Sequence, residues 1–282
     1  MASAVSNATG NVYYSKVSST TNLFFADPAS VGAPTYTAAA NVTASAFTAP
    51  SSEKGPAKGS IVDKLTIAAG FTTGNICYKN ISSLDISAKE AITFYIKPSI
   101  AVAAGVLSFV IDDTNACASV IETLPIPALA AGEWHRVLLR LNNPESDTAV
   151  LSVGLQAESD PGTVVIDIYQ PRYMDEFEGR KSFSVTQNVD SIDASDYQTS
   201  NSKEFVAGPS SWTVTFEGHK EGAPPLDKNQ EYVFALAEST TMGQAFVGNG
   251  FFTSFTPSGN VSDLMQYAYS VQGTRYLHQP VA

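Results

Sequence analysis

The feature that most constrains the fold is a recurring alternation of apolar and polar side chains. In segment 211–217, Trp212, Val214 and Phe216 alternate with Ser, Thr and Glu. Successive side chains of a β-strand point to opposite faces, so this pattern is typical of a strand with one buried and one wet face. Segment 163–169 repeats it. We therefore predict a mainly all-β protein.

Seven candidate strands follow one another between residues 61 and 173, separated by turn-forming Asp, Asn, Gly and Pro. Short strands at such spacing are typical of a β-sandwich. We predict that 61–173 is a sandwich domain of accessory (decoration) type. Its candidate strands are 64–68, 74–78, 91–96, 105–111, 133–141, 149–156 and 163–169.

Residues 1–60 are rich in Ala, Ser, Thr and Pro and contain one strand-like segment, Asn11–Tyr14. We expect an arm or edge segment there. An acidic run over 173–179 that ends in Gly marks a domain boundary, so 174–282 forms a second domain, which we expect to be a β-barrel or sandwich.

One short helix is predicted in this second domain, over Asp227–Ala237. Asp227 would be its N-cap, and Gln230 would complete a capping box. A strand is the alternative, because Tyr232, Phe234 and Leu236 also alternate with their neighbours.

The balance of charged residues argues against a protein that binds nucleic acid tightly. The 282 residues include 16 basic and 27 acidic side chains, which gives a net charge of −11, whereas a nucleic-acid-binding protein would show a basic face. Charged residues make up 15% of the chain, against about 25% in ordinary soluble domains. The excess of acidic over basic residues is greatest per residue after residue 170, where the chain has 7 basic and 13 acidic residues.

No targeting or membrane segment is expected. The first residues lack the basic and apolar regions of a signal peptide. The longest apolar stretch, 100–107, is too short to span a membrane. Cys77 and Cys117 form no metal or redox motif, and we predict two free thiols in apolar strands.

No constellation of residues predicts catalysis, so we expect no enzyme and no catalytic, cofactor-binding or metal-binding residue. The turn 112–115 reads Asp-Asp-Thr-Asn, which favours a conformational role over a surface Ca²⁺ site. Gly248 and Gly250 are interpreted as sites of tight strand packing, because no helix follows to complete a dinucleotide loop. Trp134 is interpreted as a core residue, not as a platform for sugar.

Six fragments occur in order between residues 183 and 264. Segment 246–255 resembles the pattern F-x-G-x-G-F-V-T-S-F, and 212–218 matches W-S/T-V-S/T-x-x-G. The fragments are 183–190, 191–199, 203–208, 212–218, 246–255 and 258–264. Together they resemble the tail tube (major tail) proteins of long-tailed bacteriophages.

Segment 65–173 is similar to the jelly-roll, carbohydrate-binding-like sandwiches that occur as accessory domains in phage structural proteins. Three segments carry this likeness: 83–88, 92–97 and 128–134.

The resemblance implies a structural virion protein of a siphophage tail, made in the host cytoplasm. Subunits of that family form hexameric rings whose sheets close into a channel, and the rings stack into a tube through which DNA passes during ejection. Its partners would be other copies of itself, other phage tail proteins and DNA in transit, with no specific DNA binding. A capsid decoration protein, another tail component and a carbohydrate-binding host-receptor module are the alternatives.

Two groups of residues receive roles from this resemblance. A long loop, about Asp190 to Ala207, would reach neighbouring subunits. Its candidate interface residues are Asp190, Asp193, Asp196, Tyr197, Lys203, Glu204 and Phe205. A polar strand face would line the channel or an intersubunit surface, through Ser211, Thr213, Thr215 and Glu217. We further hypothesise that an acidic lumen repels phosphate and lets DNA slide.

Overall fold

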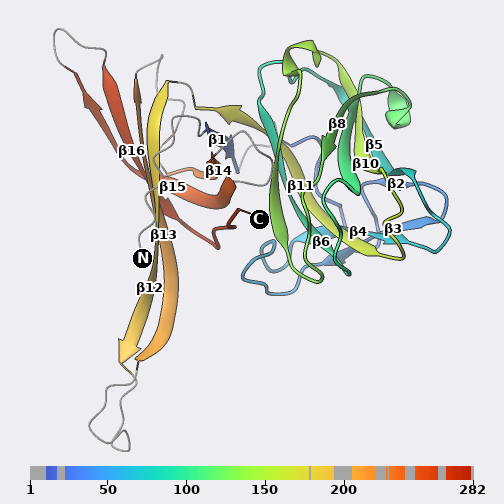
Figure 1. Cartoon of the computed structure of the whole chain (residues 1–282), viewed down its shortest axis with the longest axis horizontal. Coiled ribbons are helices and arrows are strands. Elements are labelled where there is room, and N and C mark those ends of the chain that lie inside the picture. The colour runs from blue at the N-terminus through green and yellow to red at the C-terminus, as the bar shows by residue number, and fades with distance from the viewer. Residues whose placement is uncertain are drawn as a thin grey trace, which may run out of the picture.

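A computed structural model describes residues 11–17, 23–177, 179–193, 205–219, 227, 229–238, 245–259 and 265–280. Apart from two short 3₁₀ turns, its regular elements are all strands (Figure 1), which confirms the predicted all-β class. The strands are β1 (Asn11–Lys16), β2 (Thr37–Ala38), β3 (Val42–Thr48), β4 (Ile61–Ile67), β5 (Gly74–Leu84), β6 (Ala91–Pro98), β7 (Leu107–Asp112), β8 (Val120–Pro125), β9 (His135–Arg140), β10 (Val150–Ala157), β11 (Val165–Glu176), β12 (Arg180–Asp193), β13 (Phe205–His219), β14 (Glu231–Ala237), β15 (Ala245–Ser258) and β16 (Gln266–Gly273).

Strands β2–β11 form a β-sandwich, which we call the sandwich half. One layer is the sheet β2-β5-β10-β7-β8, and the other contains β3, β4, β11, β6 and β9. Apolar residues from both layers form one buried cluster, in which the rings of Phe94 and Phe109 lie 5.3 Å apart. Two of these strands, β2 and β3, come from the first sixty residues.

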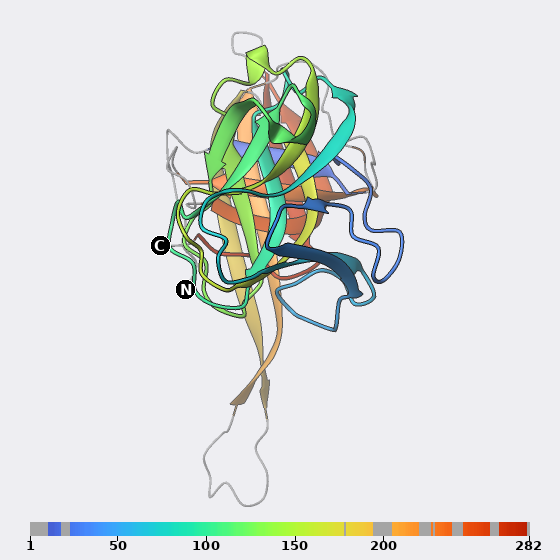
Figure 2. The same cartoon turned by 90° about the vertical axis from the view of Figure 1, so that its right-hand side faces the viewer.

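The remaining strands, β1 and β12–β16, form what we call the aromatic half. Their order is β12-β13-β16-β15-β14-β1, and β1 also pairs with β11 of the sandwich half. One sheet therefore runs through both halves (Figures 1 and 2).

The predicted helix over Asp227–Ala237 is wrong, because residues 231–237 are strand β14. Tyr232, Phe234 and Leu236 belong to the aromatic core, whereas Val233 and Ala235 belong to a second buried cluster toward the sandwich half. Both faces of β14 are buried, and β1 and β15 hydrogen-bond to its two edges. These tertiary contacts override the capping signal.

Aromatic rings fill the core of the aromatic half. Phe216 stacks on Tyr269 with ring centroids 4.9 Å apart, and Phe177 meets both rings edge-on at the same distance. Such pairs contribute about 0.5–1.5 kcal/mol each beyond the area they bury. Phe177 lies between β11 and β12, so the connection between the halves is anchored in this core.

Three glycines make room for Trp212 in this core. A Cβ atom on Gly273 would overlap the indole ring, and Cβ atoms on Gly248 and Gly250 would also crowd it. The interpretation of Gly248 and Gly250 as sites of tight packing is therefore confirmed.

Several predictions for the sandwich half are also confirmed. Trp134 is a core residue, 6% exposed and packed against Gly55. Cys77 and Cys117 are free and buried, and burial raises the pKa of each thiol; Cys77 lies on strand β5 as expected, but Cys117 ends a 3₁₀ turn and is not in a strand. The carboxylate of Asp112 accepts hydrogen bonds from the backbone of Thr114 and Ser119, so it organises its own turn.

Two buried carboxyl groups meet at the edge of the sandwich. Glu122 accepts hydrogen bonds from the backbone N–H groups of Asn142 and Asn143, and Asp147 lies beside it at 1% exposure. Burial, and next the negative charge of Glu122, raise the pKa of Asp147 to about 6. A raised pKa in the folded state means that the contribution of Asp147 to stability is complete below about pH 4 and is lost as pH rises through 6.

We predict that D147N removes this dependence. Between pH 5 and pH 8, its free energy of unfolding should fall by about 1 kcal/mol less than that of the wild-type protein. Urea unfolding at both pH values measures the difference. D113N, at an exposed position in a nearby turn, is the matched control. Parallel pH profiles for D147N and the wild-type protein would contradict the prediction.

Candidate functional site: a two-faced sheet and its junction with the sandwich

Strands β12, β13, β16 and β15 form a sheet with one apolar and one polar face. The apolar face belongs to the aromatic core. On the opposite face, hydroxyl side chains line up in rows, such as Ser184, Thr215, Ser270 and Ser254 across the four strands. We call this surface the polar face, and it comprises Ser182, Ser184, Thr186, Asn188, Ser211, Thr213, Thr215, Glu217, His219, Phe251, Ser254, Thr256, Ser258, Gln266, Ala268, Ser270 and Gln272.

The four residues predicted for a polar strand face lie together on this surface. Ser211, Thr215 and Glu217 are exposed and Thr213 is half-buried, while Trp212, Val214 and Phe216 between them are buried. The alternation that predicted the strand is therefore present. Their role toward a channel or a neighbouring subunit stays a prediction.

The polar face carries little charge. Glu217 is the only charged side chain among the residues that define it. Other carboxylates of this part of the chain lie elsewhere. Asp175 pairs with Lys89 at 2.6 Å, Asp227 pairs with Lys16 at 3.0 Å, and Glu231 lies at the junction. The acidic surplus after residue 170 is thus not gathered on this face within the described residues.

Two backbone edges of this sheet have no strand partner among the described residues. Strand β12 pairs with β13 alone. Strand β15 pairs with β14 only as far as Phe251, so residues 252–258 have β16 as their one neighbour. An unpaired edge presents N–H and C=O groups that can bind another strand.

The predicted loop from Asp190 to Ala207 is shorter than expected. Strand β12 continues through Asp193, which pairs with Phe205 at the start of β13. Asp190 and Asp193 are therefore exposed positions on a strand, at the end of a hairpin that extends away from the body of the molecule (Figures 1 and 2). Asp196, Tyr197, Lys203 and Glu204 lie outside the described residues.

This hairpin also exposes apolar side chains. Val189 is 60% exposed and Ile192 is 53% exposed, both on β12. Scattered exposed apolar residues are common, but here they lie along an unpaired edge. The combination makes β12 a candidate contact surface.

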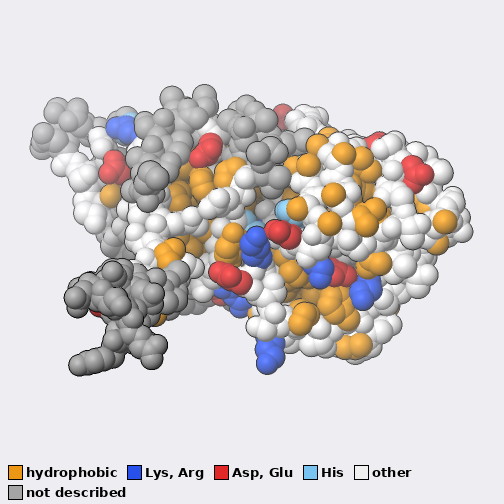
Figure 3. Space-filling model, turned by 60° about the horizontal axis from the view of Figure 1, so that its bottom comes forward, with side chains coloured by type: hydrophobic (Ala, Val, Ile, Leu, Met, Phe, Trp, Pro, Cys, Tyr) orange, Lys and Arg blue, Asp and Glu red, His pale blue; other side chains and the backbone are white. Residues whose placement is uncertain are grey.

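The two halves meet through a buried apolar cluster. Tyr13 and Val233 of the aromatic half join Ala91, Leu138 and Met174 of the sandwich half in it. Around this junction, Figure 3 shows basic and acidic side chains near one another at the centre of one face. Within the sandwich half, the Nζ of Lys54 lies 3.0 Å from a carboxylate oxygen of Glu133.

Buried polar side chains cross the junction as well. Arg136 on β9 donates hydrogen bonds to Tyr95 at 3.0 Å and to Asn249 on β15. Arg172, which is fully buried, donates to the carbonyl of Lys16 at 3.0 Å. Burial, and then the charge of Arg136, lower the pKa of His278 to about 3, so this ring is neutral at neutral pH.

The part of the chain that the structure describes shows no metal-binding cluster and no membrane-spanning helix. No group of three or more His, Cys, Asp or Glu side chains there is placed to hold a metal ion. The indole of Trp134 is not exposed to a ligand. None of the described residues forms a helix long and apolar enough to cross a membrane.

No family model matches this chain, and no curated protein sequence matches it. Among solved structures, the chain is similar to one described as "Tail of empty GTA particle computed with helical refinement, C6 symmetry", with a TM-score of 0.32 and 13% sequence identity. The match covers 38% of this chain and 87% of that chain.

We predict that both halves unfold as one unit, because they share a sheet and a buried junction. The chain has two tryptophans, Trp134 in the sandwich half and Trp212 in the aromatic half. In W134F and in W212F, the single remaining indole reports on one half. In each variant the fluorescence midpoint in urea should coincide with the circular dichroism midpoint. Separate midpoints would show that the junction does not couple the halves.

Proposed function

We propose that this chain is a structural subunit of the tail tube of a long-tailed bacteriophage. In this proposal, subunits assemble into hexameric rings that stack into a tube, and genomic DNA passes through the channel into the host. The protein would be part of the virion, would contact other tail proteins and would carry out no catalysis.

The observation that carries the proposal is the two-faced sheet with two unpaired edges. Strand β12 lies on one side of this sheet and residues 252–258 of β15 lie on the other. Pairing β12 of one copy with this part of β15 in the next is a head-to-tail contact, and such contacts generate rings when the rotation closes. Ring closure would cover both edges, which would otherwise promote uncontrolled association.

The resemblance to tail tube proteins also points to this sheet as the part of the chain that builds the tube. Fragments 183–190, 212–218 and 246–255 lie on β12, β13 and β15, three of the four strands of this sheet. The sandwich half joins it through β1 and β11, away from the two unpaired edges. We infer that the sandwich decorates the outside of the tube.

The polar face would line the channel. Hydroxyl and amide groups on a sheet offer no set of cations to hold phosphates, so DNA would meet a wet surface without strong binding. We therefore replace the hypothesis of a densely acidic lumen with that of a nearly neutral channel wall, to which each subunit contributes one Glu217. Repulsion from Glu217 would add to this effect.

Proline substitution on β12 tests the edge contact. The N–H groups of two consecutive strand residues point to opposite edges of the strand. One of the variants Q187P and N188P therefore loses a backbone hydrogen bond to β13, and the other removes only an N–H on the unpaired outer edge. The outer-edge variant should keep its stability within about 1 kcal/mol and lose assembly, because proline cannot donate to a neighbouring strand.

Sedimentation velocity and negative-stain microscopy measure assembly, and urea unfolding measures stability. Q187A and N188A keep the backbone N–H groups and serve as matched controls, which should assemble like the wild-type protein. If both proline variants form the same particles as the wild-type protein, the unpaired edge of β12 is not the subunit contact.

A further inference from the structure

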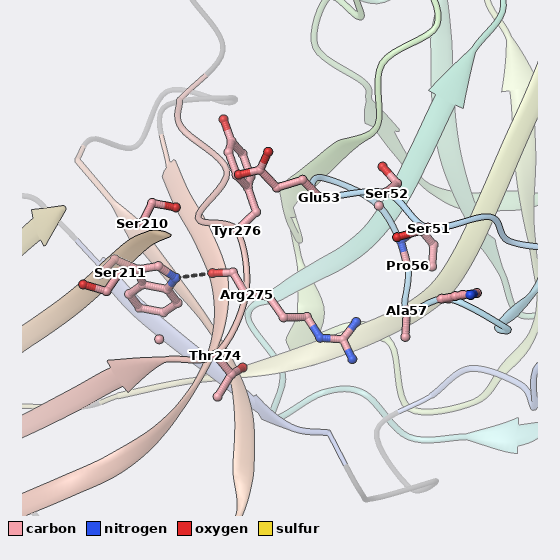
Figure 4. A pocket seen from close by; sticks show the side chains of 14 residues that line it. Ser51, Ser52, Glu53, Pro56, Ala57, Ser210, Ser211, Thr274, Arg275 and Tyr276 are labelled. Atoms are coloured by element: carbon pink, nitrogen blue, oxygen red, sulfur yellow. Dashed lines mark hydrogen bonds between the residues drawn. The ribbon is translucent and has the colours of Figure 1, made fainter. Parts of the chain in front are cut away.

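A cleft lies where the two halves meet, on the side of loop 51–58. This loop forms one wall, and residues 210–212 and 273–276 form the other (Figure 4). Its volume is about 430 Å³. A smaller cavity of about 100 Å³ shares Pro56, Ala57 and Arg275 with it and reaches the buried side chain of Arg136.

Two guanidinium groups line this smaller cavity. Arg136 is 7% exposed, and its Nε has no hydrogen-bond partner in the described part of the chain. Arg275 extends between the two walls in Figure 4, and none of the described residues forms an ion pair or a side-chain hydrogen bond with its guanidinium. Each guanidinium carries five donors and no acceptor, so both side chains retain unused donors.

The cavity has more positive than negative charge. Glu231 is the carboxylate on its wall, and its Oε1 already accepts hydrogen bonds from Thr274 at 2.7 Å and Asn249 at 3.1 Å. Burial lowers the pKa of Arg136, Tyr95 and Glu231 oppose that shift, and the charge of Arg275 adds to it. The buried Arg172 lies close enough for Arg136 to lower its pKa too.

The positive charge of the buried Arg136 is costly unless it is paired, and its Nε has no partner in the described part of the chain. A bound anion would offset that cost. Guanidinium groups bind carboxylate and phosphate oxygens with two parallel hydrogen bonds, which gives strong and directional contacts.

We propose that Arg136 and Arg275 bind a small oxyanion, of the phosphate or carboxylate class, in the cavity between the two halves. Arg136 comes from β9 of the sandwich half, and Arg275 follows β16 of the aromatic half. The bound anion therefore contacts both halves and stabilises their junction. This proposal does not depend on the function in a tail tube.

Thermal unfolding of the full chain tests the site, with inorganic phosphate and acetate as probes. Each is titrated at pH 7 against sodium chloride of equal ionic strength. At least one oxyanion should raise Tm along a saturable curve, beyond the effect of chloride, because a ligand that binds only the folded state stabilises it. A response to phosphate alone identifies the phosphate class, a response to acetate alone identifies the carboxylate class, and equal responses show that the site accepts either oxyanion.

Substitutions test whether the rise in Tm arises from binding in this cavity. R275Q removes an exposed side chain and should weaken the response at least tenfold while its circular dichroism spectrum stays unchanged. K58Q is the matched control, because Lys58 is an exposed cation that lines the outer cleft but not the inner cavity. Its response should stay within twofold of the wild-type response.

A57D supplies a carboxylate from a wall that cleft and cavity share. This variant should have a higher Tm without added oxyanion and no further response to it. The proposal is overturned if R275Q responds as the wild-type protein does, or if neither oxyanion acts beyond sodium chloride.

Discussion

The structure depends on the backbone pairing of strand β1. It hydrogen-bonds to β14 along six residues and to β11 through Tyr13 and Tyr14, so it lies inside the sheet with partners on both sides. Its side chains divide accordingly, with Val12 in the aromatic core and Tyr13 in the junction cluster. A segment near the N-terminus thereby joins the sandwich half to the aromatic half, although β11 and β14 lie more than 140 residues further along the chain.

This pairing has consequences for the far side of the sheet. Because β1 pairs with both β14 and β11, the unpaired strand edges of the aromatic half among the described residues lie at β12 and at the distal part of β15. The fold thus separates the attachment to the sandwich from a surface whose backbone groups have no strand partner among the described residues. That separation is what a subunit needs if it must hold a domain on one side and polymerise on the other.

The alternation of side chains predicted the strands because it reports directly on burial. It worked best for 211–217, where one face is apolar and the other is wet. It gave an ambiguous signal for 231–237, where both faces are buried and a capping signal precedes the strand. It also could not show that β12 and β13 extend into the expected loop, since polar residues at Asp190 and Asp193 are as compatible with a loop as with an exposed strand.

The junction could not be predicted from the sequence. Nothing around Arg136 or Arg275 distinguishes them from surface arginines, and their proximity arises from contacts between residues more than a hundred positions apart. Likewise, the strand-like character of Asn11–Tyr14 was visible, but its place between β14 and β11 was not. The net charge predicted only part of the electrostatics, because composition does not show where the carboxylates lie. Several of them form ion pairs or lie at the junction.

We propose that the polar face of β12, β13, β16 and β15 lines the channel of an assembled tube. A helical reconstruction of the assembled protein by cryo-electron microscopy tests it most directly. We expect rings of six subunits in which Thr215 and Glu217 face the lumen, β12 pairs with β15 of the next subunit, and the sandwich lies outside. A tube in which these two side chains face outward, or lie beneath the sandwich, would contradict it.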